Sequence, residues 1–191
     1  MSTILTTDDL IKQLMTTPTR DFLERLSAKL RQDKFDLGKI IDLTFHPDAQ
    51  VGFRAARLLD TTMLANPQLY TEHLPYFVQR MTEVTNASCK RHYARIMMHL
   101  TNPGSSAAIR DKLKETDLEG VVEQCFDWLI DPKVKVAVKV CAANTLFYLC
   151  GRYGWIKEEL TTQVQFMLRD GSPAIQLRGR KLLALIEKLK V

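Results

Sequence analysis

Residues 118–150, LEGVVEQCFDWLIDPKVKVAVKVCAANTLFYLC, form the most apolar stretch of the chain and constrain its fold most strongly. Apolar residues in the first half recur at i, i+3, i+4, i+7, i+8 and i+11, which places them on one helical face. They are Leu118, Val121, Val122, Cys125, Phe126 and Leu129. Thr116 and Glu119 match a capping box, and Asp131 before Pro132 matches the start of a second helix. The stretch therefore predicts two antiparallel helices joined by a proline-marked turn.

A β-strand is the alternative for the second half of this stretch. Valines at 134, 136, 138 and 140 alternate with other residues, as in a half-buried strand. The apolar run, however, continues through CAANTLFYLC to about twenty residues without a turn signal, which is too long for an ordinary strand. We therefore predict a helix over residues 132–150. Because a helix that is apolar nearly all round must be covered on both sides, the hairpin should lie inside a stack.

Composition indicates an ordinary soluble protein. The 191 residues are 46% hydrophobic and 26% charged, which suits a single domain with a sizeable core. The N-terminal stretch lacks the features of a signal peptide, and the apolar runs are too short to span a bilayer, so we expect a cytoplasmic location. Four cysteines without CxxC spacing, Cys89, Cys125, Cys141 and Cys150, indicate reduced core residues. The net charge of +5 favours acidic partners without identifying one.

Helix and turn signals divide the rest of the chain into similar units. Residues 8–15 and 18–33 predict two amphipathic helices that cap the stack within residues 1–35. The first hairpin turns at residues 46–50 and the second at 85–88, with a break at Leu74 because Pro75 cannot continue a helix. Residues 106–114 predict a short extra helix. The last hairpin turns at residues 170–173.

The spacing of these turns indicates a repeat protein. Hairpins that turn near residues 47, 86, 132 and 172 are offset by roughly 39, 46 and 40 residues, within the ~40–47 period of HEAT and armadillo units. We therefore predict an all-α, right-handed α-α superhelix. It should be a single domain, an α-solenoid of about four hairpins over residues 36–191 after the capping helices.

Three segments carry a finer resemblance: CFDWLIDPKVKVAVKV, the following WIKEEL and the late RGRKLL. In these segments the chain resembles a family of small bacterial HEAT-like proteins, whose members are sometimes labelled as adenylosuccinate lyases. Lyases of that superfamily are longer and carry a serine-rich loop with a downstream methionine, lysine and asparagine, which residues 105–112 do not match. The resemblance thus implies a fold and no activity. Asp48 and Arg54 also match the turn aspartate and helix arginine of HEAT units, whereas the other three units lack that pair.

Basic residues occur in pairs on one face of each expected second helix. The pairs are Arg54 and Arg57, Arg91 and Arg95, Lys135 and Lys139, and Arg178 and Lys181. If the hairpins stack in register, these pairs form a positive stripe that can bind phosphates or an acidic protein segment. The alternative is that they are the ordinary solvated cations of a soluble helical protein.

Other candidate sites are weaker. Cys89 and His92 have the spacing of two metal ligands on a helix, but no second pair completes a zinc site, so we predict no metal, cofactor or catalytic residue. We predict a non-enzymatic scaffold that binds another macromolecule, with a protein as the expected partner. The alternative is nucleic-acid binding through the basic stripe, resembling the HEAT-like alkylpurine DNA glycosylases. Those enzymes need aromatic residues, an aspartate and an arginine around a flipped base, and Trp128, Trp155 and Asp127 are too few to form such a site. The oligomeric state is left open.

Overall fold

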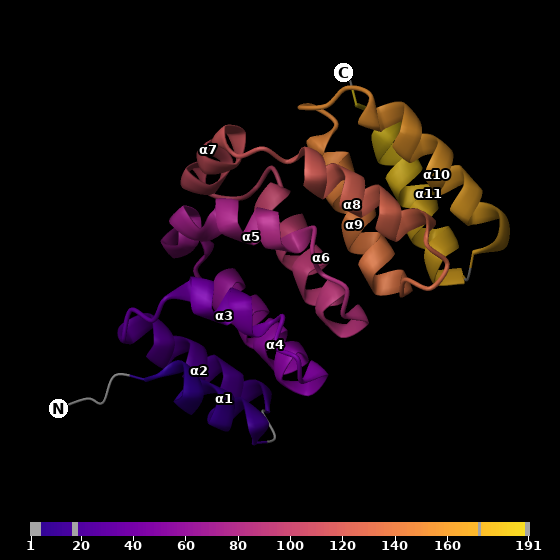
Figure 1. Ribbon diagram of the computed structural model, residues 1–191. Helices are drawn as coiled ribbons and strands as arrows, with labels where there is room; N and C mark the ends of the chain where they lie inside the picture. Colours follow the sequence, from indigo (N-terminus) through magenta and orange to yellow (C-terminus); the bar gives the residue numbers. More distant parts are fainter. Residues whose placement is uncertain (1–4, 17–18, 172, 190–191) are drawn as a thin grey trace.

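The computed structural model describes residues 5–16, 19–171 and 173–189, which form helices and no strand (Figure 1). In chain order the elements are α1 (Thr7–Met15), α2 (Arg20–Gln32), α3 (Leu37–Leu43), α4 (Ala49–Ala65), the 3-10 helix η1 (Pro67–His73), α5 (Leu74–Met81), α6 (Ala87–Thr101), α7 (Ala107–Glu115), α8 (Glu119–Ile130), α9 (Val136–Leu149), α10 (Ile156–Asp170) and α11 (Pro173–Glu187). The all-α prediction is confirmed. Pro18, the expected first residue of the second helix, lies outside the described residues, as does Ser172 in the last turn.

The helices stack as successive hairpins, α3/α4, α5/α6, α8/α9 and α10/α11 (Figure 1). The second helices α4, α6 and α9 pack side by side, and α11 follows next to α9. The first helices α3, α5 and α8 pack in turn on the other side, and α2 packs against α4 at the N-terminal end. This arrangement is the predicted α-solenoid. We call the surface formed by α4, α6, α9 and α11 the second-helix face.

Local sequence explains where the second helices begin. The Asp48 carboxylate accepts the backbone N–H of Gln50 at 2.8 Å and so caps α4, as Asn86 caps α6 through Ser88 at 2.9 Å. At Gly52, a Cβ atom would lie 2.9 Å from the Thr44 carbonyl oxygen, so glycine permits the close approach of α4 to the end of α3. These features make the turn between α3 and α4 tight.

The central hairpin lies inside the stack, as its composition predicts. Val121, Cys125 and Leu129 of α8 are fully buried, and so are Ala142 and Leu146 of α9. These side chains belong to one continuous core that extends from the first helices to Ile186. All four cysteines are free thiols; Cys89, Cys125 and Cys150 are buried as predicted, whereas Cys141 is only half-buried. No described helix is both long and apolar enough to cross a bilayer.

The structure corrects the start of α9. Asp131 ends α8 rather than capping α9, and its carboxylate accepts the Lys133 N–H at 2.8 Å. Its carbonyl accepts the Val134 N–H at 3.2 Å, so residues 132–135 form a turn and α9 begins at Val136. The helix prediction is therefore confirmed over Val136–Leu149 and wrong for residues 132–135 and for Cys150, which follows the end of α9. The strand alternative is wrong.

A second correction concerns the start of α8. Thr116 does not form a capping box with Glu119, because its hydroxyl donates to the Lys112 carbonyl at 2.8 Å, within the end of α7. Asp117 instead accepts the Glu119 N–H at 2.9 Å. The break predicted at Leu74 is confirmed, since η1 ends at His73 and α5 begins at Leu74 with Pro75 in its first turn.

Candidate second-helix binding surface

The predicted basic residues lie on α4, α6, α9 and α11 or directly before them, but they have different surroundings. Arg54 donates to the carbonyl oxygens of Leu14 and Met15, both at 2.8 Å, in the last turn of α1. Lys139 donates to the Leu129 carbonyl of α8 at 2.7 Å. The last carbonyls of a helix have no partner within it, so both cations satisfy neighbouring helix ends. Arg54 and Lys139 thus have structural contacts of their own.

Arg95 takes part in a buried polar cluster between α4 and α6. One carboxylate oxygen of Asp60 accepts from Arg95 at 2.8 Å and lies 2.9 Å from Nδ1 of His92. Asp60 is 4% exposed, and its other carboxylate oxygen has no hydrogen-bond partner among the described residues. The cluster lines a hollow of about 540 Å³ that also includes Arg57, whose guanidinium lies 5.9 Å from the centre of the Phe53 ring. This hollow presents mixed charge.

Three of the predicted cations lie on two helices that pack against α9, the helix that carries the half-buried thiol of Cys141. Burial raises the pKa of Cys141, and the positive charges of Arg95, Arg178 and Arg91 act in the opposite direction. Arg91 and Arg95 come from α6, whereas Arg178 comes from α11. The fold therefore places cations on both neighbours of α9 in the second-helix face.

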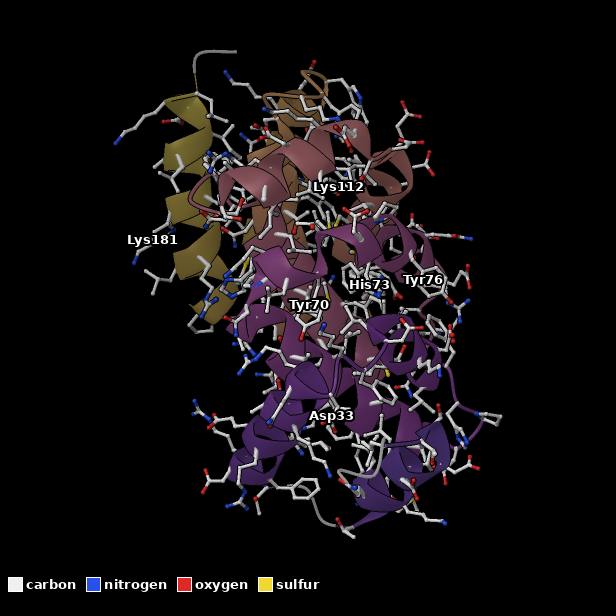
Figure 2. The ribbon with its side chains drawn as sticks, turned by 90° about the vertical axis from the view of Figure 1, so that its left-hand side faces the viewer. Asp33, Tyr70, His73, Tyr76, Lys112 and Lys181 are labelled. Atoms are coloured by element: carbon white, nitrogen blue, oxygen red, sulfur yellow. The ribbon has the colours of Figure 1, made fainter. Side chains whose placement is uncertain are left out.

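The remaining predicted residues lie at the C-terminal part of the same face. Lys135 is exposed and precedes α9 directly. Arg178 and Lys181 of α11 are exposed and line a groove of about 430 Å³, together with apolar side chains of α9, α10 and α11. Figure 2 shows Lys181 at the outer edge of α11, extending away from the stack.

Sequence reasoning missed two features of this surface. Asp60 is a carboxylate inside the apolar run RLLDTTML, and such an interruption of a buried helix was a visible signal for a polar cluster. Leu177 and Leu185 recur with Lys181 at i, i+4 and i+8, a pattern that places apolar residues on an exposed stripe of α11. The role of each feature depends on a neighbouring helix, α6 for Asp60 and α9 for the leucines of α11.

The other candidate residues lie elsewhere. Cys89 donates to the Thr44 carbonyl, 3.7 Å away, and His92 faces Asp60, so the two have separate contacts. Among the described residues, no group of three or more potential ligands is placed to hold a metal ion. Trp128 is 1% exposed in the core, whereas Trp155 stacks on Phe126 with ring centres 5.7 Å apart. Asp127 is exposed on α8. A buried Trp128 is not available to contact a flipped base.

Comparison with known proteins agrees with this architecture. A family model of the HEAT repeat domain matches residues 10–186, nearly the whole chain. Searches of curated proteins and of solved structures found no match. The stacked hairpins and the extent of the family match lead to one conclusion: this chain belongs to the HEAT repeat family.

Proposed function

We propose that this chain is a non-enzymatic HEAT-repeat scaffold that binds an acidic segment of another protein on its second-helix face. The observation that carries the proposal is that both neighbours of α9 in the second-helix face bear exposed cations, Arg91 and Arg95 on α6 and Arg178 and Lys181 on α11. Cations from two helices that flank a third create a region of positive potential wider than one repeat. Such a region attracts and orients a partner of opposite charge.

The predicted cations contribute unequally to this surface. Arg91, Arg178 and Lys181 are exposed and hydrogen-bond to no described residue, so they are available to a partner's carboxylates. Arg54 and Lys139 already donate hydrogen bonds to backbone carbonyl groups at the ends of other helices. Arg95 shares the Asp60 carboxylate with His92. These three add positive charge to the face but offer fewer free donors.

Nucleic acid is the second candidate, because guanidinium and ammonium groups also bind phosphates. The side chains next to the free cations favour protein. Leu177 precedes Arg178 and is 61% exposed, and Val136 follows Lys135 and is 37% exposed. A phosphate backbone leaves such apolar surface uncovered, whereas a protein segment can bury it.

Charge reversal tests the proposal. The double variant Arg91→Glu, Arg178→Glu should weaken binding of a fluorescent glutamate-rich peptide by roughly tenfold or more and flatten its salt dependence. Fluorescence anisotropy at several NaCl concentrations measures both effects. Lys12→Glu, Lys29→Glu is the matched control, because it makes the same change in net charge on exposed sites of α1 and α2.

Three outcomes would count against the proposal. Equal losses in the two double variants would mean that net charge alone drives binding. Tight binding of a single-stranded DNA probe without binding of the acidic peptide would favour the nucleic-acid candidate. Absence of binding to either probe would remove the binding role of this face. Thermal unfolding should show that both variants stay folded, because exposed helix positions tolerate substitution.

A further inference from the structure

The groove beside α11 has an apolar interior. Its walls come from α9 and α11, and Val164 and Met167 of α10 also line it. Val136 and Val140 line it on the α9 side, and Leu177 and Leu185 on the α11 side. Side chains of this kind are favourable to bury, at about 25 cal/mol per Å² of apolar surface removed from water.

The α11 side of the groove is unusually exposed for apolar residues. Leu177 and Leu185 are 61% and 49% exposed, with Lys181 between them on the same stripe. A surface helix normally carries polar residues on its open face. Among the described residues, six of the eight large exposed hydrophobic side chains lie at or after Ile130, so this exposure is concentrated in the C-terminal part of the stack. A local concentration of exposed apolar residues indicates an interaction surface.

The packing of α11 against α10 explains why the groove beside α9 is open to solvent. At Gly179, a Cβ atom would lie 2.9 Å from Cδ2 of Leu168 and 3.3 Å from Cγ1 of Val164. The missing side chain therefore lets α11 approach α10 closely. The contact of α9 with α11 is much less extensive than its contact with α6. The space between α9 and α11 consequently remains open to solvent.

The charged side chains in the described lining of the groove are all positive. Lys139, Arg178 and Lys181 are the only charged residues among its described lining, and none of that lining is a carboxylate. Lys139 is bound to the Leu129 carbonyl, which leaves Arg178 and Lys181 for a ligand. Lys181 is among the lining residues, and its side chain extends away from the stack at the outer edge of α11 (Figure 2). The groove therefore suits a ligand with an apolar centre and acidic edges.

We propose that this groove binds an amphipathic helix of the partner protein, with aliphatic side chains in the groove and carboxylates facing Arg178 and Lys181. This inference rests on the proposed function and specifies the partner's chemistry. Leu177 and Leu185 are eight residues apart, which corresponds to about 12 Å along α11. Anchors at i and i+7 of a bound helix are about 10.5 Å apart, so they match this spacing.

Charge complementarity favours this occupant over a second copy of the chain. A symmetric dimer through the same stripe would bring Lys181 and Arg178 close to their own copies, and like charges repel. An acidic helix instead pairs with both cations. Its leucines would cover Leu177 and Leu185, which a purely electrostatic partner would leave in water.

Three synthetic, fluorescently labelled helical peptides test the inference with the full chain. The first carries leucines at i, i+3, i+4 and i+7 with glutamates elsewhere, the second replaces the leucines with glutamines, and the third replaces the glutamates with lysines. The first should bind tightest in anisotropy titrations. Leu185→Asp should weaken it by roughly tenfold or more, whereas Leu185→Met should retain binding.

A matched control comes from η1, which packs against α4, α5 and α7 and contributes no residue to the groove's described lining. Leu69 of η1 is 57% exposed, close to the exposure of Leu185, so Leu69→Asp makes the same chemical change away from the groove. It should leave binding of the first peptide unchanged. Leu185→Gln removes the apolar side chain without adding a charge, so it should weaken the first peptide and leave binding of the leucine-free acidic peptide unchanged, because that peptide contacts only the cations.

The outcomes separate this inference from the proposed function. Equal affinities for the two acidic peptides would overturn the groove as a helix site and leave the acidic-segment proposal standing. No binding of either acidic peptide would overturn both. A dimer in light scattering that Leu185→Asp dissociates would assign the groove to a second copy of the chain and overturn the partner helix.

Discussion

The ammonium group of Lys139 in α9 lies 2.7 Å from the carbonyl oxygen of Leu129 in α8. Leu129 is in the last turn of α8, where carbonyl groups have no partner within the helix. Burial lowers the pKa of Lys139, and the nearby Asp131 carboxylate partly opposes this effect. The hydrogen bond therefore joins the two helices of the central hairpin at their shared turn.

Removal of this donor should destabilise the protein. Lys139→Met keeps the length of the side chain but leaves the Leu129 carbonyl without its partner, which should reduce the free energy of unfolding by about 1–3 kcal/mol. Urea denaturation measures the change. Lys135→Met is the control, because Lys135 is exposed before α9. Identical urea midpoints for the two variants would show that the contact adds no net stability.

Gly52→Ala should also destabilise the protein, although alanine normally favours a helix over glycine by about 1 kcal/mol. The new Cβ would lie 2.9 Å from the backbone oxygen of Thr44, which cannot move aside as a side chain can. We expect a loss of about 1–3 kcal/mol in the free energy of unfolding. Gly151→Ala is the control, since no atom lies within 4 Å of its Cβ position. A Gly52→Ala protein as stable as the control would contradict the close approach of α3 and α4.

Alkylation of Cys141 tests whether the cations of α6 and α11 act on the pKa of its thiol. Burial raises the pKa of this thiol, the positive charges of Arg95, Arg178 and Arg91 lower it, and the Asp60 charge raises it. Arg95→Gln removes one cation and leaves the Asp60 charge less compensated, so the pKa of Cys141 should rise. Because the thiolate is the reactive form, the iodoacetamide reaction should need higher pH in the variant.

Mass spectrometry of the modified peptide distinguishes Cys141 from the other three cysteines, which are buried. Burial raises the pKa of Cys89 to about 11, so that thiol should react more slowly at pH 8 to 9. Arg25→Gln, on the exposed part of α2, should leave the Cys141 profile unchanged. An unchanged profile in Arg95→Gln would place its guanidinium too far from the thiol to matter.

Chelation should not affect folding. Cys89 and His92 bind Thr44 and Asp60, respectively, and the described residues contain no cluster suited to a metal ion. Thermal unfolding with and without a strong chelator should therefore give the same midpoint. A fall of many degrees on chelation would reveal a metal bound to the folded state, because such a ligand stabilises by mass action.

The sequence by itself determined the elements and their repetition. The apolar spacing of α8, the length of the apolar run in α9 and the break before Pro75 all depend on residues within about one helix length, so local chemistry was sufficient. The sequence determined the ends of the helices less well than their existence. Asp131 could cap the next helix or close the turn, and the turn formed because Lys133 and Val134 both donate to it.

Only the tertiary structure decided which cations are available to a partner. Arg54 and Lys139 have the same spacing signal as Arg91 and Arg178, yet their partners are carbonyl groups at the ends of other helices. Arg95 meets Asp60, a residue 35 positions earlier, because α4 and α6 lie side by side. The groove likewise depends on packing between helices. The missing side chain of Gly179 lets α11 lie close to α10, and the groove lies beside α9. Such pairings depend on which helices pack together and how closely. The apolar periodicity of a single helix carries no information about either.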